Sequence, residues 1–396
     1  MYDLVVIGAG LAGCAVARQL GGRHRVLLLE SERYPVHKMC GEFLSPEASE
    51  LFVALGVADR IRSSGAVPIR RVRVTAPSGA EWQSALPGAG LGLSRWALDK
   101  ILFDAAVEAG AEGRQGARVR DVSGDAASGF TVTYESDGER RDVAARLVVG
   151  AFGKRSALDR ALGRAERDAA NLVAFKMHFT GADIGDVVEL HGFDGGYCGM
   201  SHVEEGRVNV CLIARAEAVR ASGGSFAGMC DGVLRTNPAL AHRLERLSPA
   251  MERPVAISQV PCRTRSLFAG DVVMVGDTAA MIAPLCGDGM SMALRGAAIA
   301  APLLSDVLAG ARTFEELRAT YAREWRRSFS TRLRLGRWLQ AALFQPAVAR
   351  AVEAEGLVVA VVGEGDAGGG GNHSRGSQND MARRASTHGM DYTLNS

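Results

Sequence analysis

The first 30 residues alternate between apolar stretches and glycine-rich breaks. Leu4–Ile7 and Val26–Leu29 contain no polar residue, which is typical of parallel strands buried on both faces. Leu11–Leu20 lies between them, is rich in small residues and has the length of a helix. The pattern therefore predicts a strand–helix–strand unit at the start of the chain.

A different pattern begins near residue 171. The stretches LVAFKMHF, VVELHGF and RVNVCLIA alternate apolar and polar residues between glycine-rich turns, which predicts an antiparallel sheet. Before it, residues 93–110 have the pattern of a helix with Ser94 as its N-cap, and residues 146–153 that of a buried strand. The buried-strand pattern returns near residue 270, a helix follows Gly289, and an arginine-rich helical region begins at residue 314.

These changes predict an α/β fold in which a Rossmann-like domain is interrupted by a β-rich domain. Residues 1–170 would form the first part of the Rossmann-like domain, with an excursion near 66–92 into the second domain. The β-rich domain would span 171–265, and the second part of the first domain 266–312. C-terminal helices are expected over 313–363. Residues 364–396 are rich in Gly, Ser and Asn without apolar periodicity, so we expect a disordered tail.

Composition and charge narrow the function. The chain has 47% hydrophobic and 23% charged residues and a formal net charge of +2, which gives no indication of nucleic-acid binding. An apolar strand begins almost at Met1, so no signal segment is expected. Seven cysteines are dispersed without a CxxC pair, which predicts no metal site and fits a reducing, cytoplasmic location.

The glycines after the first strand carry the clearest chemical signal. Gly8, Gly10 and Gly13 form a GxGxxG pattern that follows a strand and opens a helix, and Glu30 ends the next strand. This is the dinucleotide-binding fingerprint, in which a diphosphate meets the helix N-terminus and the acidic residue accepts hydrogen bonds from ribose. A free ribose 2′-hydroxyl is implied, hence FAD or NAD rather than NADP.

A second glycine-rich loop distinguishes FAD from NAD. Residues 272–294, VVMVGDTAAMIAPLCGDGMSMAL, run from a buried strand through Asp277 and Pro284 into a helix at Gly289. A carboxylate after the strand can accept from sugar or ribityl hydroxyls, and a helix N-terminus stabilises negative charge. Reduced flavin carries such charge and nicotinamide does not, so the loop favours FAD.

Taken together, the N-terminal GxGxxG, LSRWALDKIL, VVGAFGKRSALDR and GDTAAMIAPLCGDGMSMAL resemble the p-hydroxybenzoate-hydroxylase-type flavoprotein superfamily over residues 1–340. That superfamily includes group A flavin monooxygenases, flavin halogenases and geranylgeranyl reductases. The resemblance implies a GR2-type FAD-binding fold with a substrate sheet over the flavin. It also implies that Arg95 lies near the FAD diphosphate and Asp277 near the ribityl chain. The expected cofactor-binding residues are Gly8, Gly10, Leu11, Ala12, Gly13, Glu30, Cys40, Gly41, Arg95, Val119, Gly276, Asp277, Pro284, Gly287, Gly289 and Met290.

Within the superfamily, Cys40-Gly41-Glu42 followed by Leu44, Ser45 and Pro46 resembles the reductase and halogenase branch. Two departures are visible. Phe152 stands where the hydroxylase motif has Asp, which leaves nicotinamide binding there open, with Lys154 and Arg155 as alternative charges. GGYCGMSH keeps only Tyr197 of the aromatic-rich reductase pattern YxWxFP.

Candidate catalytic residues are Cys40, as a polar contact beside the flavin, and His178, Tyr197 and His202. A hydroxylase acting on a phenol needs a base, and histidine suits that role. Lys176 and His178 share the polar face of their strand, opposite Phe175, Met177 and Phe179. That polar face faces either the flavin cavity or solvent, and solvent is the default expectation.

The sequence thus predicts a FAD-dependent oxidoreductase. The preferred function is an NADH- or NADPH-dependent monooxygenase that hydroxylates an apolar or aromatic small molecule. The alternative is a reductase of prenyl or other isolated alkenes, resembling geranylgeranyl reductase. The arginine-rich C-terminal helices allow a peripheral membrane contact, with a solvated helix as the default, and the oligomeric state stays open.

Overall fold

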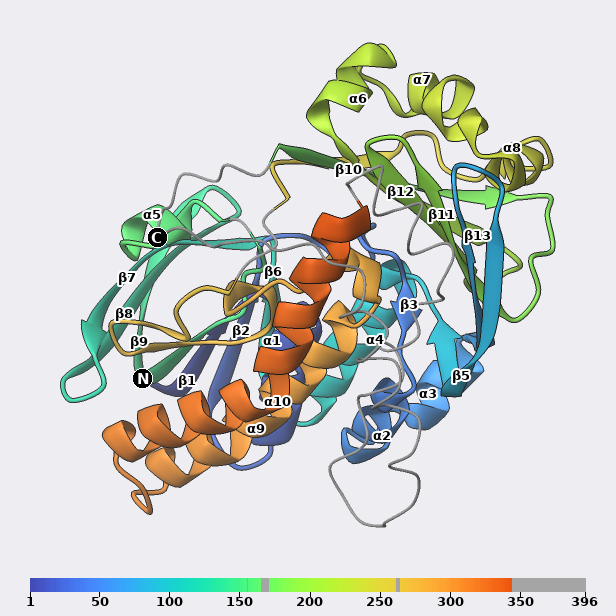
Figure 1. Ribbon diagram of the computed structural model, residues 1–396. Helices are drawn as coiled ribbons and strands as arrows, with labels where there is room; N and C mark the ends of the chain where they lie inside the picture. The colour runs from blue at the N-terminus through green and yellow to red at the C-terminus, as the bar shows by residue number, and fades with distance from the viewer. Residues whose placement is uncertain (155, 165–170, 261–263, 344–396) are drawn as a thin grey trace, which may run out of the picture. The chain divides into compact units, whose positions relative to one another are not determined.

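The computed structural model describes residues 1–154, 156–164, 171–260 and 264–343. These described residues all belong to one compact unit, which contains two sheets and the helices around them (Figure 1). This mixed α/β architecture with C-terminal helices confirms the predicted fold class. The proposed tail at 364–396, the end of the arginine-rich helical region and Arg155 lie outside the described residues.

The first sheet is built around the predicted strand–helix–strand unit. β1 (Tyr2–Ile7) and β2 (Val26–Glu30) are parallel, with Leu4 opposite Val26, and α1 (Leu11–Leu20) connects them. Their side chains are almost entirely buried because apolar neighbours cover both faces of the sheet. The strand order is β16-β17-β9-β1-β2-β6, and an antiparallel β7-β8 hairpin pairs with β9. The remaining strands are β6 (Glu112–Gln115), β7 (Ala117–Asp125), β8 (Gly129–Ser136), β9 (Glu139–Gly150), β16 (Phe268–Ala269) and β17 (Val272–Met274).

The second sheet has the order β14-β10-β13-β12-β11-β4-β5-β3, with β15 paired to β10. Its central strands are antiparallel, as the alternating pattern predicts, whereas β11 and β4 are parallel. Residues of the 66–92 segment belong to this sheet through β4 and β5. The strands are β3 (Phe43–Leu44), β4 (Val67–Thr75), β5 (Glu81–Gly92), β10 (Leu172–Thr180), β11 (Val187–Phe193), β12 (Gly196–His202), β13 (Val208–Arg215), β14 (Ser248–Pro249) and β15 (Val255–Ser258).

Helices cover both sheets. α4 begins after Ser94, whose side chain accepts a hydrogen bond from the amide of Ala97, as expected for an N-cap. The helices are α2 (Glu47–Ala54), α3 (Ala58–Ser63), α4 (Arg95–Glu108), α5 (Leu158–Ala161), α6 (Ala216–Ala221), α7 (Phe226–Asp231), α8 (Pro238–Leu244), α9 (Gly289–Leu308) and α10 (Phe314–Leu343), with short 3₁₀ turns η1 (Val233–Thr236), η2 (Gly276–Thr278) and η3 (Pro284–Cys286).

α9 is long and apolar enough to cross a bilayer by length and composition alone. More than half of it is buried inside the protein, where it packs against α1, α2 and α10. Figure 1 shows α9 and α10 running side by side. α9 therefore has the environment of a core helix, and it begins at the glycine-rich loop that the sequence links to flavin.

Candidate active site

The GxGxxG glycines have different structural roles. Gly8 has φ +98°, and a Cβ there would lie 2.4 Å from the carbonyl oxygen of Ala151. A Cβ on Gly13 would lie 1.9 Å from the carbonyl oxygen of Gly8, so helix α1 could not approach β1 so closely with any other residue. At Gly10 the nearest atom is the Arg95 guanidinium, at 3.6 Å. Gly8 and Gly13 are thus required by packing, while Gly10 leaves space at the helix N-terminus.

That space suits a diphosphate. Gly10 is the N-cap of α1 without any side-chain hydrogen bond, and the first turn of α1 contains no acidic residue. The amides at this helix end are therefore available to an anion. Arg95 adds a cation opposite them. Burial disfavours its charged form, but the ion pair with Asp99 outweighs that effect and raises the pKa of Arg95.

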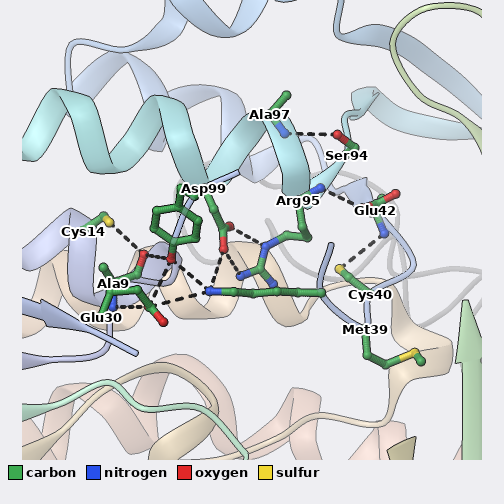
Figure 2. Close-up of polar contacts among 12 residues, drawn as sticks. Ala9, Cys14, Glu30, Met39, Cys40, Glu42, Ser94, Arg95, Ala97 and Asp99 are labelled. Atoms are coloured by element: carbon green, nitrogen blue, oxygen red, sulfur yellow. Dashed lines mark hydrogen bonds and ion pairs between the residues drawn. The ribbon is translucent and has the colours of Figure 1, made fainter. Parts of the chain in front are cut away.

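A network of charged groups joins Arg95 to the end of β2 (Figure 2). Arg95 donates to Asp99 at 2.6 and 2.8 Å. Lys38 Nζ lies 3.1 Å from the Asp99 carboxylate and 3.7 Å from that of Glu30. Glu30 accepts hydrogen bonds from the amides of Ala9 and Glu32, at 2.9 and 3.0 Å. Glu30 is consequently fixed at the carboxyl end of β2, where the fingerprint places a ribose.

The loop between β17 and α9 forms the opposite side of the site. Gly276 (φ +60°) and Gly287 (φ +65°) are in the left-handed region, and a Cβ on Gly287 would lie 2.9 Å from the ring of Phe43. Burial raises the pKa of Asp277, with Lys154 and Arg95 opposing the shift. Asp277 therefore lies in a setting where a hydroxyl-bearing ligand would supply hydrogen bonds.

The Asp288 side chain does not cap α9. It is the N-cap residue by position, but its carboxylate accepts from Ser45 Oγ and Arg332 Nη1, both at 2.9 Å, and makes no cap hydrogen bond. Gly289 and Met290, which begin α9, instead face the cavity. The helix N-terminus is thus open toward a ligand with negative charge, as reduced flavin has. These features fit FAD.

One cavity of about 250 Å³ connects these parts. Its wall includes most of the expected cofactor residues: Gly10, Leu11, Ala12, Cys40, Gly41, Arg95, Gly276, Asp277, Pro284, Gly287, Gly289 and Met290. Gly8, Gly13, Glu30 and Val119 are not part of the wall. Val119 lies in β7 and packs against the core of the first sheet. Sequence reasoning missed Met39 and Cys211, for which the chain offers no local motif, and also Met281, which lies within the glycine-rich loop 272–294.

The four catalytic candidates separate into two pairs. Cys40 and Tyr197 line the cavity, whereas His178 and His202 do not. The ring of His202 lies 3.0 Å from the amide of Ile184 and 3.3 Å from the carbonyl oxygen of Arg207. His202 therefore fastens neighbouring loops of the second sheet.

The default expectation that Lys176 and His178 face solvent is wrong. Both are fully buried, because the segment that carries Glu42 covers this face of β10. Lys176 Nζ forms an ion pair with one oxygen of Glu42, and His178 Nε2 lies 2.6 Å from the other. Burial alone would raise the pKa of Glu42, but the His178 hydrogen bond and the Lys176 charge lower it.

The buried ion cluster of Glu42, Lys176 and His178 fixes the cavity wall. Glu42 has φ +56° and also accepts from the Arg95 amide at 2.7 Å. Asn209 Nδ2 donates to the carbonyl oxygen of Cys40 at 3.2 Å. The Cys40-Gly41-Glu42 segment is therefore tied both to α4 and to the second sheet. A Cβ on Gly41 would meet no atom within 4 Å, so the segment leaves open space on its cavity side.

Comparisons with known proteins agree with this architecture. A family model described as an FAD binding domain matches residues 1–334. Digeranylgeranylglycerophospholipid reductase 2 of Methanopyrus kandleri is 30% identical over 342 residues, 83% of each chain. Menaquinone reductase of Mycolicibacterium smegmatis is 28% identical over 332 residues, 76% of each chain. The structure of the myxobacterial chondrochloren halogenase superposes with a TM-score of 0.77 at 21% identity, covering 92% of this chain and 91% of that one.

Proposed function

We propose that this chain, which belongs to the FAD binding domain family and is an FAD-dependent oxidoreductase, has a lipid substrate. In this proposal it saturates isolated carbon–carbon double bonds of a prenyl-type lipid. The sequence alone favours hydroxylation, with this reaction as the alternative. Two features of the cavity favour double-bond reduction over hydroxylation, and the names of the reductase relatives support the same proposal.

The first feature is the cavity wall contributed by the second sheet. It consists largely of aliphatic side chains, namely Val72, Leu86, Val188, Leu190, Leu212, Ile213 and Ile257. Aliphatic walls suit a ligand without polar groups, because burying an unpaired polar group is costly. A branched hydrocarbon chain fits this surface better than a phenol or an acid.

The second feature carries the proposal: within the described part of the chain, no histidine lines the cavity. His178 is held by Glu42 behind the wall, and His202 lies in the loop contacts described above. A phenol hydroxylase benefits from a base near neutral pKa at the substrate. An alkene needs no deprotonation, so a site without a histidine base is suited to reduction.

FAD supplies hydride chemistry when it is bound. The reaction is balanced by a hydride to one alkene carbon and a proton to the other, with two-electron-reduced FAD oxidised. The aliphatic wall orients the hydrocarbon and excludes water. Tyr197 and Cys40 are protic groups on the cavity wall and are candidates for supplying the proton, as are Ser201, Cys211, Cys286 and Lys154. We propose NADH or NADPH as the transient donor that reduces the enzyme beforehand.

The test uses FAD-loaded enzyme under strict anaerobiosis. The enzyme is reduced with NADH, NADPH or dithionite and given a geranylgeranyl-bearing glycerolipid or a menaquinone. Mass spectrometry should show a gain of two hydrogens for each saturated bond. In deuterated water, one deuterium should arrive as the proton, and a second should arrive where the hydride position of the reduced flavin has exchanged with solvent. Gly10→Val, which should fold but bind FAD much more weakly, is the control.

Hydroxylation predicts a different set of results. No product would form without oxygen, and in labelled dioxygen the product would carry one heavy oxygen atom. That pair of observations would overturn alkene reduction and restore the hydroxylase interpretation.

A further inference from the structure

The outer face of α10 concentrates positive charge. Arg326, Arg327, Arg334, Arg337 and Trp338 are all exposed, and the Trp338 side chain is 52% accessible. At about 100° per residue these side chains fall within an arc of about 120° on one side of the helix. The sequence from residue 325 to residue 343 contains no Asp or Glu. We call this surface the basic face of α10.

The charges of the basic face are not used within the described structure. Among the described residues, no ion pair joins Arg326, Arg327, Arg334 or Arg337 to a carboxylate. Arg323, which lies in the same arc, pairs with Glu324 at 3.1 Å, and two neighbours on other sides of the helix are also paired. Arg318 binds Asp271 at 2.6 Å. Arg332 lies 2.7 Å from Glu47 and 2.9 Å from Asp288. The four arginines of the basic face therefore lack the partners that a structural role would give them.

The opposite face of α10 packs against the cavity wall. Trp325, Phe329, Leu333 and Leu339 are buried. A Cβ on Gly336 would lie 2.8 Å from Cys286 Sγ, and Cys286 lines the cavity. The basic face is consequently separated from that wall by one helix diameter, about 10 Å.

We propose that the basic face of α10 docks on a membrane surface of anionic lipids, with Trp338 at the headgroup level. Charge complementarity identifies the occupant, and an amphipathic helix with arginine on the polar side and tryptophan at its edge is typical of interfacial binding. Docking there would hold the cavity within one helix diameter of a lipid substrate. The supply of substrate rests on the proposed function, whereas lipid binding does not.

The binding experiment uses the full-length, FAD-loaded protein and sedimentation with vesicles. Vesicles of phosphatidylcholine with phosphatidylglycerol should carry the protein down at low salt, and pure phosphatidylcholine should carry much less. Each arginine near an anionic surface contributes about fivefold to partitioning. The variant R326Q/R327Q/R334Q/R337Q should therefore lose at least about 30-fold in partitioning, allowing for non-additivity.

A matched control removes the same charge elsewhere. Arg23, Arg118, Arg140 and Arg160 are also exposed and lie outside α10. The variant R23Q/R118Q/R140Q/R160Q should partition within about twofold of the wild type if the arginines of α10 account for the effect. Trp338→Phe should abolish the part of the tryptophan quenching by brominated lipids that comes from this helix. Equal losses in both quadruple variants, or equal binding to neutral vesicles, would overturn the proposal.

Binding to acidic protein or heparin without binding to anionic vesicles would also overturn it, because the proposal commits to lipid. A second measurement separates this proposal from the proposed function. If reduction occurs, the quadruple α10 variant should be slow with substrate in vesicles and normal with substrate in detergent. If no prenyl substrate is reduced but vesicle binding follows the arginines, only the proposed function fails.

Discussion

β2 and β10 are both buried strands, but their sequences suggest opposite environments. β2 reads VLLLE and every residue is buried, as its uniform apolar pattern indicates. β10 reads LVAFKMHFT, and its alternation suggests one face in water, yet residues 174–179 are all buried. The difference lies in Glu42, which covers Lys176 from a position 134 residues away in the chain. Alternation in a sequence shows that one face of a strand is polar. Whether that face is exposed to water depends on a partner that is distant in the chain.

Removing the partner is the strongest test of this comparison. Glu42→Ala leaves Lys176 and His178 buried without their carboxylate, and breaking a buried ion pair costs about 3–5 kcal/mol in the free energy of unfolding. Urea unfolding of the FAD-free protein, to separate folding from cofactor binding, measures the loss.

A triple variant, Glu42→Leu with Lys176→Met and His178→Leu, provides the control. It removes all three polar groups together, and apolar replacement of a buried ion cluster is often neutral. Most of the lost stability should return. If Glu42→Ala unfolds at the same urea concentration as the wild type, the cluster is not what holds β10 against the cavity segment.

Substitutions of two glycines at the nucleotide-binding end of α1 provide a comparable test on the first sheet. Gly13→Ala introduces a Cβ 1.9 Å from the Gly8 carbonyl oxygen, so it should lower the free energy of unfolding by about 1–3 kcal/mol. Gly10→Val should leave the fold largely intact, because the nearest atom to its Cβ position is a flexible guanidinium at 3.6 Å. It should nevertheless weaken FAD binding by at least about tenfold, because its side chain occupies the anion site.

Flavin content and melting temperature, measured together, distinguish the two glycines. Gly13→Ala with wild-type stability would show that α1 can move away from β1. Gly10→Val with full FAD content would show that the diphosphate binds elsewhere.

These contrasts explain what the sequence could predict. The β1–α1–β2 unit, the N-cap at Ser94 and the glycine turns near Asp277 depend on neighbours within a few residues, so a local pattern contains the information. The association of β4 with β11, and of Glu42 with Lys176 and His178, depends on residues more than 100 positions apart. No periodicity contains that information. Most of the expected cavity residues therefore belong to the two glycine-rich loops and the helix starts that follow them, whereas most of the missed ones, such as Val188 and Ile213, lie on the second sheet.

The dependence of stability on pH, on the acid side, should also reveal the buried ion cluster of Glu42, Lys176 and His178. Burial, then the Lys176 and His178 charges, lower the pKa of His37 from 6.5 to about 4, with Arg207 acting in the same direction and Glu42 opposing it. His37 lies next to His178 and Trp96, with ring centroids 5.0 and 4.6 Å apart. Below pH 6.5 His37 therefore binds a proton in the unfolded chain but not in the folded protein. The free energy of unfolding should fall as the pH is lowered from 6.5 to about 4.

His37→Asn removes this titration. Its melting temperature should fall less than that of the wild type between pH 7 and pH 5, by about 2 °C. Below that window both proteins should lose stability as Glu42, whose folded pKa is lowered, takes up a proton. Parallel melting curves for the two proteins across pH 7 to 5 would contradict the assignment for His37.

The smallest effect on stability is expected for an ion pair that is exposed to solvent. Arg120 and Glu135 face each other across β7 and β8 at 2.6 Å, and both side chains are more than two-fifths exposed. Their attraction is screened by solvent, and such pairs contribute about 0–1 kcal/mol to stability. Glu135→Gln should accordingly shift the urea midpoint far less than Glu42→Ala, although both changes remove a carboxylate from a pair shorter than 3 Å. The shift should shrink further in 1 M salt, while the Glu42 effect should persist, because salt does not reach a buried cluster. Equal losses for the two variants would mean that the cluster on β10 is hydrated, and that its alternation had indicated solvent correctly.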